Sequence, residues 1–543
     1  MKSIPWSGLP NVTRIAKEFV LGRPNVVKLL GGDCRCEETR SLVRDARLKA
    51  FEGRTKKLSK ALRASYGNLE IPPAVDANLK KLEGNNTLAV VTGQQLGLFG
   101  GALYSYYKTL TVCEIAKRLE ETSGINVVPM FWLASSDSDF SEINHIAFPP
   151  DDGIIRECGY LPKDLVRGEA LGYHRLTDEI LGSCDLVRSW LSKSLHYKTL
   201  ADCIQQCFQP GKFMVDAFRE LYTELFGDLG LIVVDSLNEH LVKDSDEFWE
   251  NVLYEPERLN AYYEETSKEI EDMTFALQVR LRSDTLPFHY IDRNGMRKRV
   301  YGRDGSYKIG PDGEQVSQQY LYDLLKSGEG IFSPAALLRP LYQDWLLPTW
   351  IYVAGPGEIS YHAQIGTSYD ALGVVHPLIM PRLSATLLDL PSIRWMEKHN
   401  WAVADVLGGK MVLLRSDGRD RELNELFEKG LGQLEGWLKR IESAFYEAGI
   451  NDDDQLDKAG RKIRYQWGKL HQSAVNKVAI QNKVRTEHAE RLLVRLFPDG
   501  ILQERYYSPL YFLDRYDGFR DLLIDAIEIG TWEHRIISLG EAR

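Results

Sequence analysis

The segment Thr87–Lys108, TLAVVTGQQLGLFGGALYSYYK, constrains the fold of this chain more than any other. It begins with an apolar, partly β-branched run at Leu88–Thr92, which has the length of a buried parallel strand. A glycine-rich turn follows, and the apolar spacing of Ala102–Leu119 predicts a helix. A strand, turn and helix in this order leave backbone N–H groups at a helix start, where an anion can bind. The alternative is that the glycines only let the helix pack closely on the sheet.

Four later segments repeat this pattern of a short apolar strand that stops at glycines or polar residues. They are Asn126–Ala134, Leu231–Asp235, Trp350–Ala354 and Val374–Met380. The carboxyl ends of parallel strands meet at one rim, and α/β sheets bind their ligands outside that rim. The sequence therefore predicts an α/β fold with a parallel sheet and a site at its rim.

The candidate site residues follow directly from these five strand ends. They are Gln94, Gln95 and Gly97 after the first strand; Asp137, Asp139 and His145 after the second; Asp235 at the third; Gly355, Gly357, Glu358, Tyr361 and His362 after the fourth; and Arg382 and Ser384 after the fifth. We predict catalytic roles for Gln95, Asp137, Asp139 and His145, and substrate or nucleotide binding for the others. Carboxylates can bind a substrate ammonium group, while Arg382 and glycine-turn N–H groups can bind phosphate or carboxylate. The alternatives are a merely solvated acidic loop and histidines with structural roles.

Between and after the strands, the periodicity predicts insertions and a long helical hairpin. The predicted units are 1–134 (helices and first half of the core), 135–207 (first insertion), 208–239 (core helix and strand), 240–330 (second insertion), 331–416 (second half of the core), 417–497 (hairpin) and 498–543 (a segment that docks on the body). From Phe427 onward, apolar residues alternate at spacings of four and three, which is a coiled-coil seam, and the chain reverses at 449–454. Because this antiparallel hairpin is too thin to form a core alone, we expect a homodimer.

Composition narrows the class of partner. A net charge of −10 and a pI near 5.7 argue against non-specific binding of nucleic acid or anionic membranes, so a small-molecule partner is favoured. No apolar run approaches the roughly 20 residues that span a bilayer, and the N-terminus lacks secretory-signal features, so we expect a cytoplasmic protein. The seven cysteines show no zinc-like spacing, and no metal site is predicted. Serine-elbow, Walker, HExxH and GxGxxG motifs do not occur.

Several motifs together resemble one known family. They are TGQQLGLFGGALYSYYK, VPMFWLASSDSDFSEINH, FSPAALLRPLYQDWLLPTWIYVAGPGEISYHAQIG, MPRLSAT and FPDGILQERYYSPLYFLDRY. In this order, from about residue 10 to the C-terminus, the chain strongly resembles the bacillithiol biosynthesis cysteine-adding enzymes. The resemblance implies a Rossmann-like core of the class I synthetase and nucleotidyltransferase type, two connecting-peptide insertions, and a C-terminal coiled coil that makes the dimer. It also implies a ligase that joins the cysteine carboxyl to the amine of glucosaminyl-malate in the last step of bacillithiol synthesis.

The implied reaction requires activation of a carboxylate, because a carboxylate is a poor acyl donor. An adenylate or acyl phosphate would serve, so we expect ATP with Mg as co-substrate. GQQLGLFGG stands where class I synthetases carry HxGH, and PRLSAT stands where they carry KMSKS, so activation by another donor stays open. Two other classes also stay open: a nucleotidyltransferase with another acceptor, and a non-catalytic dimer that binds a nucleotide or metabolite.

Overall fold

A five-stranded parallel sheet forms the centre of the protein. The computed structural model describes residues 2–151, 153–191, 197–303, 305–414, 418–448, 453–481, 483–530 and 532–542. The strand order is β13-β12-β2-β3-β6, with every neighbouring pair parallel. The bounds are β2 Thr87–Gln94, β3 Asn126–Leu133, β6 Ile232–Asp235, β12 Thr349–Ala354 and β13 Leu378–Pro381. The predicted parallel α/β sheet is thus confirmed, but its fifth strand starts later than predicted, after Pro377, which has no N–H for a neighbouring strand.

The strand order contains a topological switch point. Starting from β2, the chain adds β3 and β6 on one side and then β12 and β13 on the other. The connections therefore diverge between β2 and β12, and in open α/β sheets ligands bind at such a point. Helix α6 (Leu103–Ser123) follows β2 and packs on β2, β3 and β12, while α15 (Pro356–Ile365) follows β12. The two glycine turns named above thus lie at the switch point.

Burial explains why these short apolar runs become strands. Every residue of β12, and every residue of β2 except Gln94, is buried. Strands that are buried along their whole length need cover on both faces of the sheet, which helices provide in α/β proteins. Helix α3 (Glu37–Ala50), like α6, packs on β2 and β12. The main hydrophobic core therefore encloses the sheet and holds its carboxyl rim in place.

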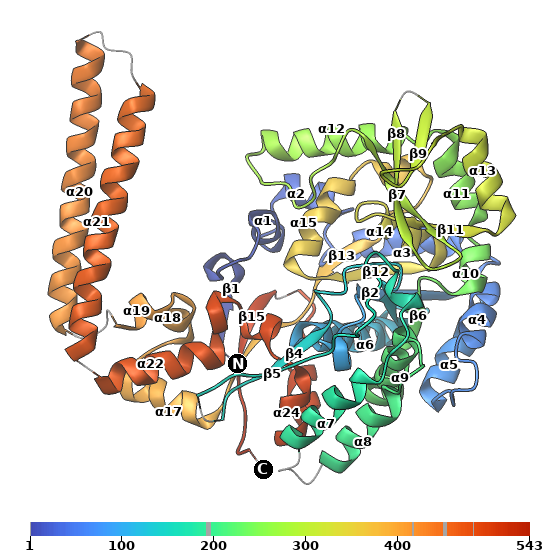
Figure 1. The fold of residues 1–543 in the computed structure, drawn as a ribbon, viewed down its shortest axis with the longest axis horizontal. Coiled ribbons are helices and arrows are strands. Elements are labelled where there is room, and N and C mark those ends of the chain that lie inside the picture. The colour runs from blue at the N-terminus through green and yellow to red at the C-terminus, as the bar shows by residue number, and fades with distance from the viewer. Residues whose placement is uncertain are drawn as a thin grey trace.

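Two insertions interrupt the core, and Figure 1 shows them above and below the core strands. The first carries β4 (His145–Phe148), β5 (Arg156–Gly159), α7 (Glu179–Leu191) and α8 (Tyr197–Cys207), and leads to the core helix α9 (Met214–Phe226). The second contains α11 (Asp246–Tyr254), α12 (Arg258–Asp272), α13 (Gln318–Ser327) and an antiparallel sheet of order β10-β9-β8-β7-β11. Its strands are β7 Thr285–Asp292, β8 Arg297–Arg303, β9 Ser306–Ile309, β10 Gln315–Val316 and β11 Gly330–Pro334.

The predicted coiled coil is confirmed as a hairpin that stands away from the body (Figure 1). It consists of α20 (Gly418–Glu447) and α21 (Asp453–Gln481); residues 449–452 of the predicted turn lie outside the described residues. Phe427 joins the two helices, with its ring 5.5 Å from that of Trp467 and 4.6 Å from that of His471. Helix α22 (Lys483–Leu496) then packs on α17 (Leu390–His399), α18 (Val403–Leu407) and α19 (Lys410–Leu414).

The C-terminal segment closes the body against the N-terminus. Strand β15 (Glu533–Ser538) lies between β1 (Lys2–Pro5), which is antiparallel to it, and β14 (Ser384–Leu388), which is parallel to it. Helices α23 (Gln503–Tyr506) and α24 (Pro509–Arg515) contact α6 and α8, respectively. Within the described ranges, we find no helix with the length and apolar character needed to cross a membrane.

Candidate functional site

The backbone geometry of the first glycine turn requires glycine at several positions. A Cβ atom on Gly97 would lie 2.8 Å from the Cα atom of Gly101, and Gly100 and Gly101 have φ angles of +93° and +75°. Only glycine adopts such backbone with ease, so close backbone approach explains these positions. The start of α6 is not free, because the Leu103 N–H donates to the Tyr507 carbonyl oxygen at 2.8 Å. This N–H group is therefore not available to an anion.

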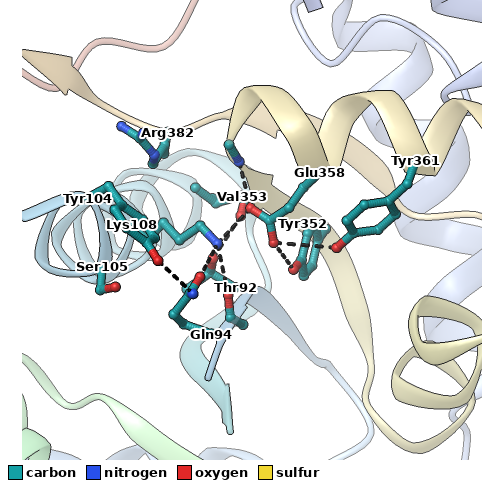
Figure 2. Close-up of polar contacts among 12 residues, drawn as sticks. Thr92, Gln94, Tyr104, Ser105, Lys108, Tyr352, Val353, Glu358, Tyr361 and Arg382 are labelled. Atoms are coloured by element: carbon teal, nitrogen blue, oxygen red, sulfur yellow. Dashed lines mark hydrogen bonds and ion pairs between the residues drawn. The ribbon is translucent and has the colours of Figure 1, made fainter. Parts of the chain in front are cut away.

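A buried ion pair crosses the switch point instead. Lys108, on α6, has a side chain that is only 2% exposed, and its Nζ lies 2.6 Å from Oε2 of Glu358 on α15. The same Nζ donates to the Gly93 carbonyl oxygen at 2.8 Å and to Gln94 Oε1 at 3.1 Å. Figure 2 shows Lys108 pointing between the end of β2 and the start of α15. One cation thus holds together the two strand ends that flank the switch point.

Burial and charge oppose each other in this ion pair. Burial lowers the pKa of Lys108 to about 8, and the Glu358 carboxylate limits that drop. Burial tends to raise the pKa of Glu358, but the Lys108 ammonium outweighs it and holds this pKa below its ordinary value. The Glu358 carboxylate also accepts hydrogen bonds from the Gly355 N–H at 2.7 Å and the Tyr352 hydroxyl at 2.8 Å. The N-terminus of α15 therefore already binds an anion, its own Glu358 side chain.

Aromatic hydroxyl groups extend this network on both sides of the ion pair (Figure 2). The Tyr361 hydroxyl lies 3.5 Å from Glu358 Oε1 and accepts a hydrogen bond of 2.6 Å from Nη2 of Arg339. On the opposite side, Nε2 of Gln94 donates to the Tyr104 hydroxyl at 2.8 Å. These contacts fix the polar groups before any ligand binds, which lowers the cost of ordering them.

An acidic group of residues lies beside the ion pair. Nε2 of Gln95 donates to Asp137 Oδ2 at 2.7 Å and to Glu142 Oε2 at 2.9 Å. Nη1 of Arg297, on β8 of the second insertion, lies 3.3 Å from Asp137 Oδ1. The first strand end, the second strand end and the second insertion therefore meet at Asp137.

A pocket of about 700 Å³ lies at the switch point, and its lining includes the Lys108–Glu358 ion pair and the carboxylates of Asp137 and Glu142. Eight of the predicted site residues line it: Gln94, Gln95, Asp137, Gly355, Gly357, Glu358, Tyr361 and Arg382. Sequence reasoning missed other lining residues with polar side chains, namely Tyr104, Lys108, Glu142, Gln278, Arg339 and Arg505. Lys108 had a usable signal, because it is a single lysine within an otherwise uncharged helical stretch at 102–113.

Three further predicted residues lie near the pocket but outside it. Gly97 and His145 line a small neighbouring cavity of about 100 Å³, which also touches Gln94 and Gln95. Asp139 lines a different cavity of about 340 Å³, formed within the first insertion. The structure therefore places Asp139 and His145 on cavities other than the pocket that Asp137 lines.

Asp235, His362 and Ser384 do not line the pocket. Asp235 is buried, accepts a hydrogen bond from Ser135, and lies 3.4 Å from Arg219 Nη2. His362 is fully buried, neither of its ring nitrogens has a hydrogen-bond partner among the described residues, and burial holds its pKa well below the ordinary value. It is a neutral core histidine, as the alternative interpretation proposed. The Ser384 hydroxyl instead donates a hydrogen bond to the Glu504 carboxylate.

Arg382 forms the edge of the pocket through a second buried ion pair. Its Nη2 lies 2.6 Å from Oε1 of Glu504, and both side chains are only 1% exposed. Oε2 of Glu504 accepts hydrogen bonds from the Ser384 hydroxyl at 3.0 Å and the Ala385 N–H at 2.9 Å. Nε of Arg382 has no hydrogen-bond partner in the described part of the chain and lies 3.5 Å from the place that a Cβ atom on Gly355 would take. Arg382 therefore has a buried N–H group without a partner beside the turn at Gly355.

Arg505 adds an accessible cation. Its guanidinium lies 5.5 Å from the centre of the Tyr104 ring, and it has no ion-pair partner within the part of the chain that the structure describes. Glu504 and Arg505 come from the C-terminal segment, more than a hundred residues from Arg382. No local pattern in the sequence could have shown that Arg505 would line a pocket built on the sheet, or that Glu504 would pair with Arg382.

Comparisons with known proteins agree with this architecture. Residues 9–383 match the family model described as "Bacillithiol biosynthesis BshC, N-terminal Rossmann-like domain", and residues 385–539 match "Bacillithiol biosynthesis BshC, C-terminal coiled-coil domain". A protein of Koribacter versatilis named "Putative cysteine ligase BshC" is 28% identical over 500 residues, or 89% of this chain and 90% of that protein. A protein of the same name from Heliobacterium modesticaldum is 30% identical over 80% of each chain.

Both regions of the chain are therefore accounted for by one family. The match to the Rossmann-like domain covers the core sheet and both insertions, and the second match covers the hairpin and the C-terminal segment. The protein belongs to the BshC family of bacillithiol biosynthesis.

Proposed function

We propose that this protein is a cysteine ligase that forms an amide between the cysteine carboxyl and the amine of glucosaminyl-malate, the last step of bacillithiol synthesis. The name of its relatives supports this activity. The observation that carries the proposal is the pocket at the switch point, which presents cations and carboxylates to one space. Arg382 and Arg505 suit carboxylates or phosphates, and Asp137 with Glu142 suits an ammonium group.

The proposed bond formation is an acyl transfer. The amine nitrogen attacks the carbonyl carbon of the activated cysteine, a C–N bond forms, and the C–O bond to the leaving group breaks with its electron pair. The nitrogen gives up its proton to a carboxylate, for which Asp137 is the candidate because it is anchored by Gln95 and Arg297. The three N–H groups of Lys108 already bind Glu358, Gly93 and Gln94, so the Arg505 guanidinium is the candidate for stabilising negative charge that develops on oxygen within the pocket.

ATP is the proposed activating co-substrate, and the pocket has groups suited to its phosphates. The guanidinium of Arg505 and the unpaired Nε of Arg382 would hold them. When bound, ATP supplies the group that converts a carboxylate oxygen of cysteine into a leaving group. Within the described ranges, no three His, Cys, Asp or Glu side chains are placed to hold a metal ion. The proposed Mg²⁺ would therefore bind mainly through phosphates and water, with Glu142 as protein ligand.

The test is incubation with ATP, cysteine and glucosaminyl-malate, with the product identified by mass spectrometry. We expect bacillithiol, and release of pyrophosphate or of phosphate distinguishes activation as an adenylate from activation as an acyl phosphate. A nucleotidyltransferase with another acceptor would consume ATP without this product, and a non-catalytic binding protein would consume none. Either result would contradict the proposed function.

Asp137→Asn and Gln95→Ala are each expected to abolish detectable bacillithiol formation. The first removes the carboxylate that faces the amine, and the second releases Asp137 and Glu142 from their shared hydrogen-bond donor. Product formation is measured alongside circular dichroism and sedimentation, which should remain as in the unsubstituted protein. Asp272→Asn, at the exposed end of α12, is the matched control. Unimpaired synthesis in both pocket variants would remove Asp137 from the mechanism.

We also propose that the protein is a cytoplasmic homodimer that pairs through the hairpin. Leu426, Trp437 and Leu470 are large apolar side chains on α20 and α21 that are 66%, 51% and 58% exposed. Such exposure on a two-helix hairpin favours cover by a second copy. Leu426→Glu/Leu470→Glu is expected to shift the protein from dimer to monomer in sedimentation velocity at micromolar concentration. Leu42→Glu, on α3 and 73% exposed, is the control; a monomeric unsubstituted protein would contradict the proposal.

A further inference from the structure

A second cavity, of about 370 Å³, adjoins the pocket at the switch point. The two share Ala134, Asp137, Ala336 and Arg339 as lining residues. The remaining wall comes mostly from the second insertion, through the segment 279–287 and strands β7 and β8. A volume of this size accommodates a small organic group, and Asp137 stands at the boundary between the two cavities.

This adjoining cavity is strongly basic. Five of the described residues that line it are arginines, namely Arg280, Arg282, Arg297, Arg299 and Arg339, against the carboxylate of Asp137. The chain as a whole has a net charge of −10, so this local excess of positive charge is not an average property of its surface. A concave wall of one charge sign attracts an anion of matching size.

Two of these arginines are available for a ligand. Arg280 and Arg299 form no ion pair with any residue of the described ranges, whereas Arg282 pairs with Asp284 at 3.1 Å and Arg297 with Asp137 at 3.3 Å. Guanidinium groups bind carboxylates in a bidentate fashion through two parallel N–H groups. Two free guanidinium groups can therefore bind two carboxylates.

His289 provides an independent sign of a missing polar partner. It lines the cavity, and its Nδ1 is buried without a hydrogen-bond partner from the residues that the structure describes. Burial, together with Arg297 and Arg299, lowers the pKa of His289 to about 3, so the imidazole is neutral. An unsatisfied buried nitrogen is unfavourable unless a ligand or water meets it. A neutral ring beside the arginines adds a hydrogen bond without adding charge.

We infer that the arginine cavity binds the dicarboxylate of the malate group of glucosaminyl-malate. This inference rests on the proposed function and names the subsite for the amine donor. With the malate carboxylates between Arg280 and Arg299, the sugar would extend across the boundary and present its amine at Asp137. The phosphates of ATP would remain in the main pocket, which has its own cations in Lys108, Arg382 and Arg505.

The test uses Arg280→Gln, Arg299→Gln and the double variant in steady-state assays. We expect each substitution to raise the KM for glucosaminyl-malate by about tenfold or more, because each removes a charge-assisted contact. The KM values for cysteine and ATP, and kcat at saturating glucosaminyl-malate, should change less than about twofold. Arg293→Gln is the matched control, since Arg293 is exposed on the same insertion and does not line the cavity.

Two measurements without turnover separate this inference from the proposed activity. Isothermal titration with glucosaminyl-malate should show binding that the double variant loses, and free malate should compete with it. If bacillithiol forms but the KM for glucosaminyl-malate is unchanged in the double variant, the inference fails and the proposed function stands. If no bacillithiol forms yet glucosaminyl-malate binds in an arginine-dependent manner, the subsite stands and the proposed function fails. A rise in the KM for ATP alone would assign the cavity to phosphates and overturn the inference.

Discussion

Lys108→Met is expected to reduce bacillithiol formation by about 100-fold or more, because Lys108 holds two strand ends of the pocket in place and a displacement of about 1 Å can cost that much. Lys108 is a buried cation of the pocket and contacts both strand ends at the switch point. Methionine fills a similar volume but cannot bind Glu358, the Gly93 carbonyl oxygen or Gln94. The measurement is kcat/KM for cysteine, and Lys117→Met, exposed on the same helix, is the matched control.

A loss of folding must be separated from a loss of chemistry, because Lys108→Met leaves Glu358 as a buried carboxylate without its cation. The double variant Lys108→Met/Glu358→Gln removes both charges and is expected to recover stability in urea unfolding while remaining inactive. Recovery of activity together with stability would contradict a role for Lys108 in the chemistry.

The pH dependence of activity gives a second measure of the role of Lys108. Burial lowers the pKa of Lys108 to about 8, so activity that needs the ammonium form should fall as the pH rises through about 8. Lys108→Arg keeps a positive charge at higher pH. The activity that this variant retains should therefore no longer fall as the pH rises through about 8. If it still falls there, the decline must come from the titration of another group.

Glu504→Ala is expected to lower the free energy of unfolding by about 3–5 kcal/mol, the usual cost of removing one partner from a buried ion pair. The carboxylate binds Arg382, Ser384 and the Ala385 N–H in a space where both charged side chains are 1% exposed. Its loss leaves the Arg382 guanidinium buried without a counter-charge. Urea unfolding measures the difference. The control is Glu528→Ala, which breaks the ion pair with Arg535, in which the Glu528 side chain is 51% exposed. This control should lower the free energy of unfolding by at most about 1 kcal/mol.

The same ion pair predicts the direction of a pH effect on stability. Burial tends to raise the pKa of Glu504, but Arg382 outweighs it and holds this pKa below its ordinary value of 4.5. Its contribution to stability is therefore complete above pH 4.5 and is lost as the pH falls through the lower, folded-state pKa. Arg382→Met/Glu504→Met should be more stable than Glu504→Ala and lack this acid-dependent loss. Equal stability of both variants would contradict the account of an uncompensated charge.

Local patterns in the sequence were sufficient for the sheet and the hairpin. Short apolar runs that stop at glycine or polar residues form β2, β3, β6, β12 and β13. They could be recognised because a parallel strand that is buried on both faces is apolar along its whole length. The alternation of four and three became the α20–α21 hairpin. Parallel strands bring their carboxyl ends to one rim. The pocket is therefore lined by residues that follow the strand ends, among them Gln94, Gln95 and Asp137.

The direction of the side chains that follow the strand ends could not be predicted from these local patterns. Asp137 and Asp139 are two residues apart, yet they line different cavities, and His362 points into the core one residue after the pocket-lining Tyr361. Once a strand has ended, orientation depends on the turn and on what packs against it.

The periodicity of apolar residues along the chain was enough to predict the α/β class, the parallel sheet, the helical hairpin and the rim on which the candidate site lies. Which charges meet depends on how the chain packs in three dimensions. Lys108 faces Glu358 across 250 residues of sequence, Arg382 faces Glu504, and Arg297 reaches Asp137 from the second insertion. Such pairs form because desolvated charges need partners wherever the packing places them, and no local pattern in the chain records that placement.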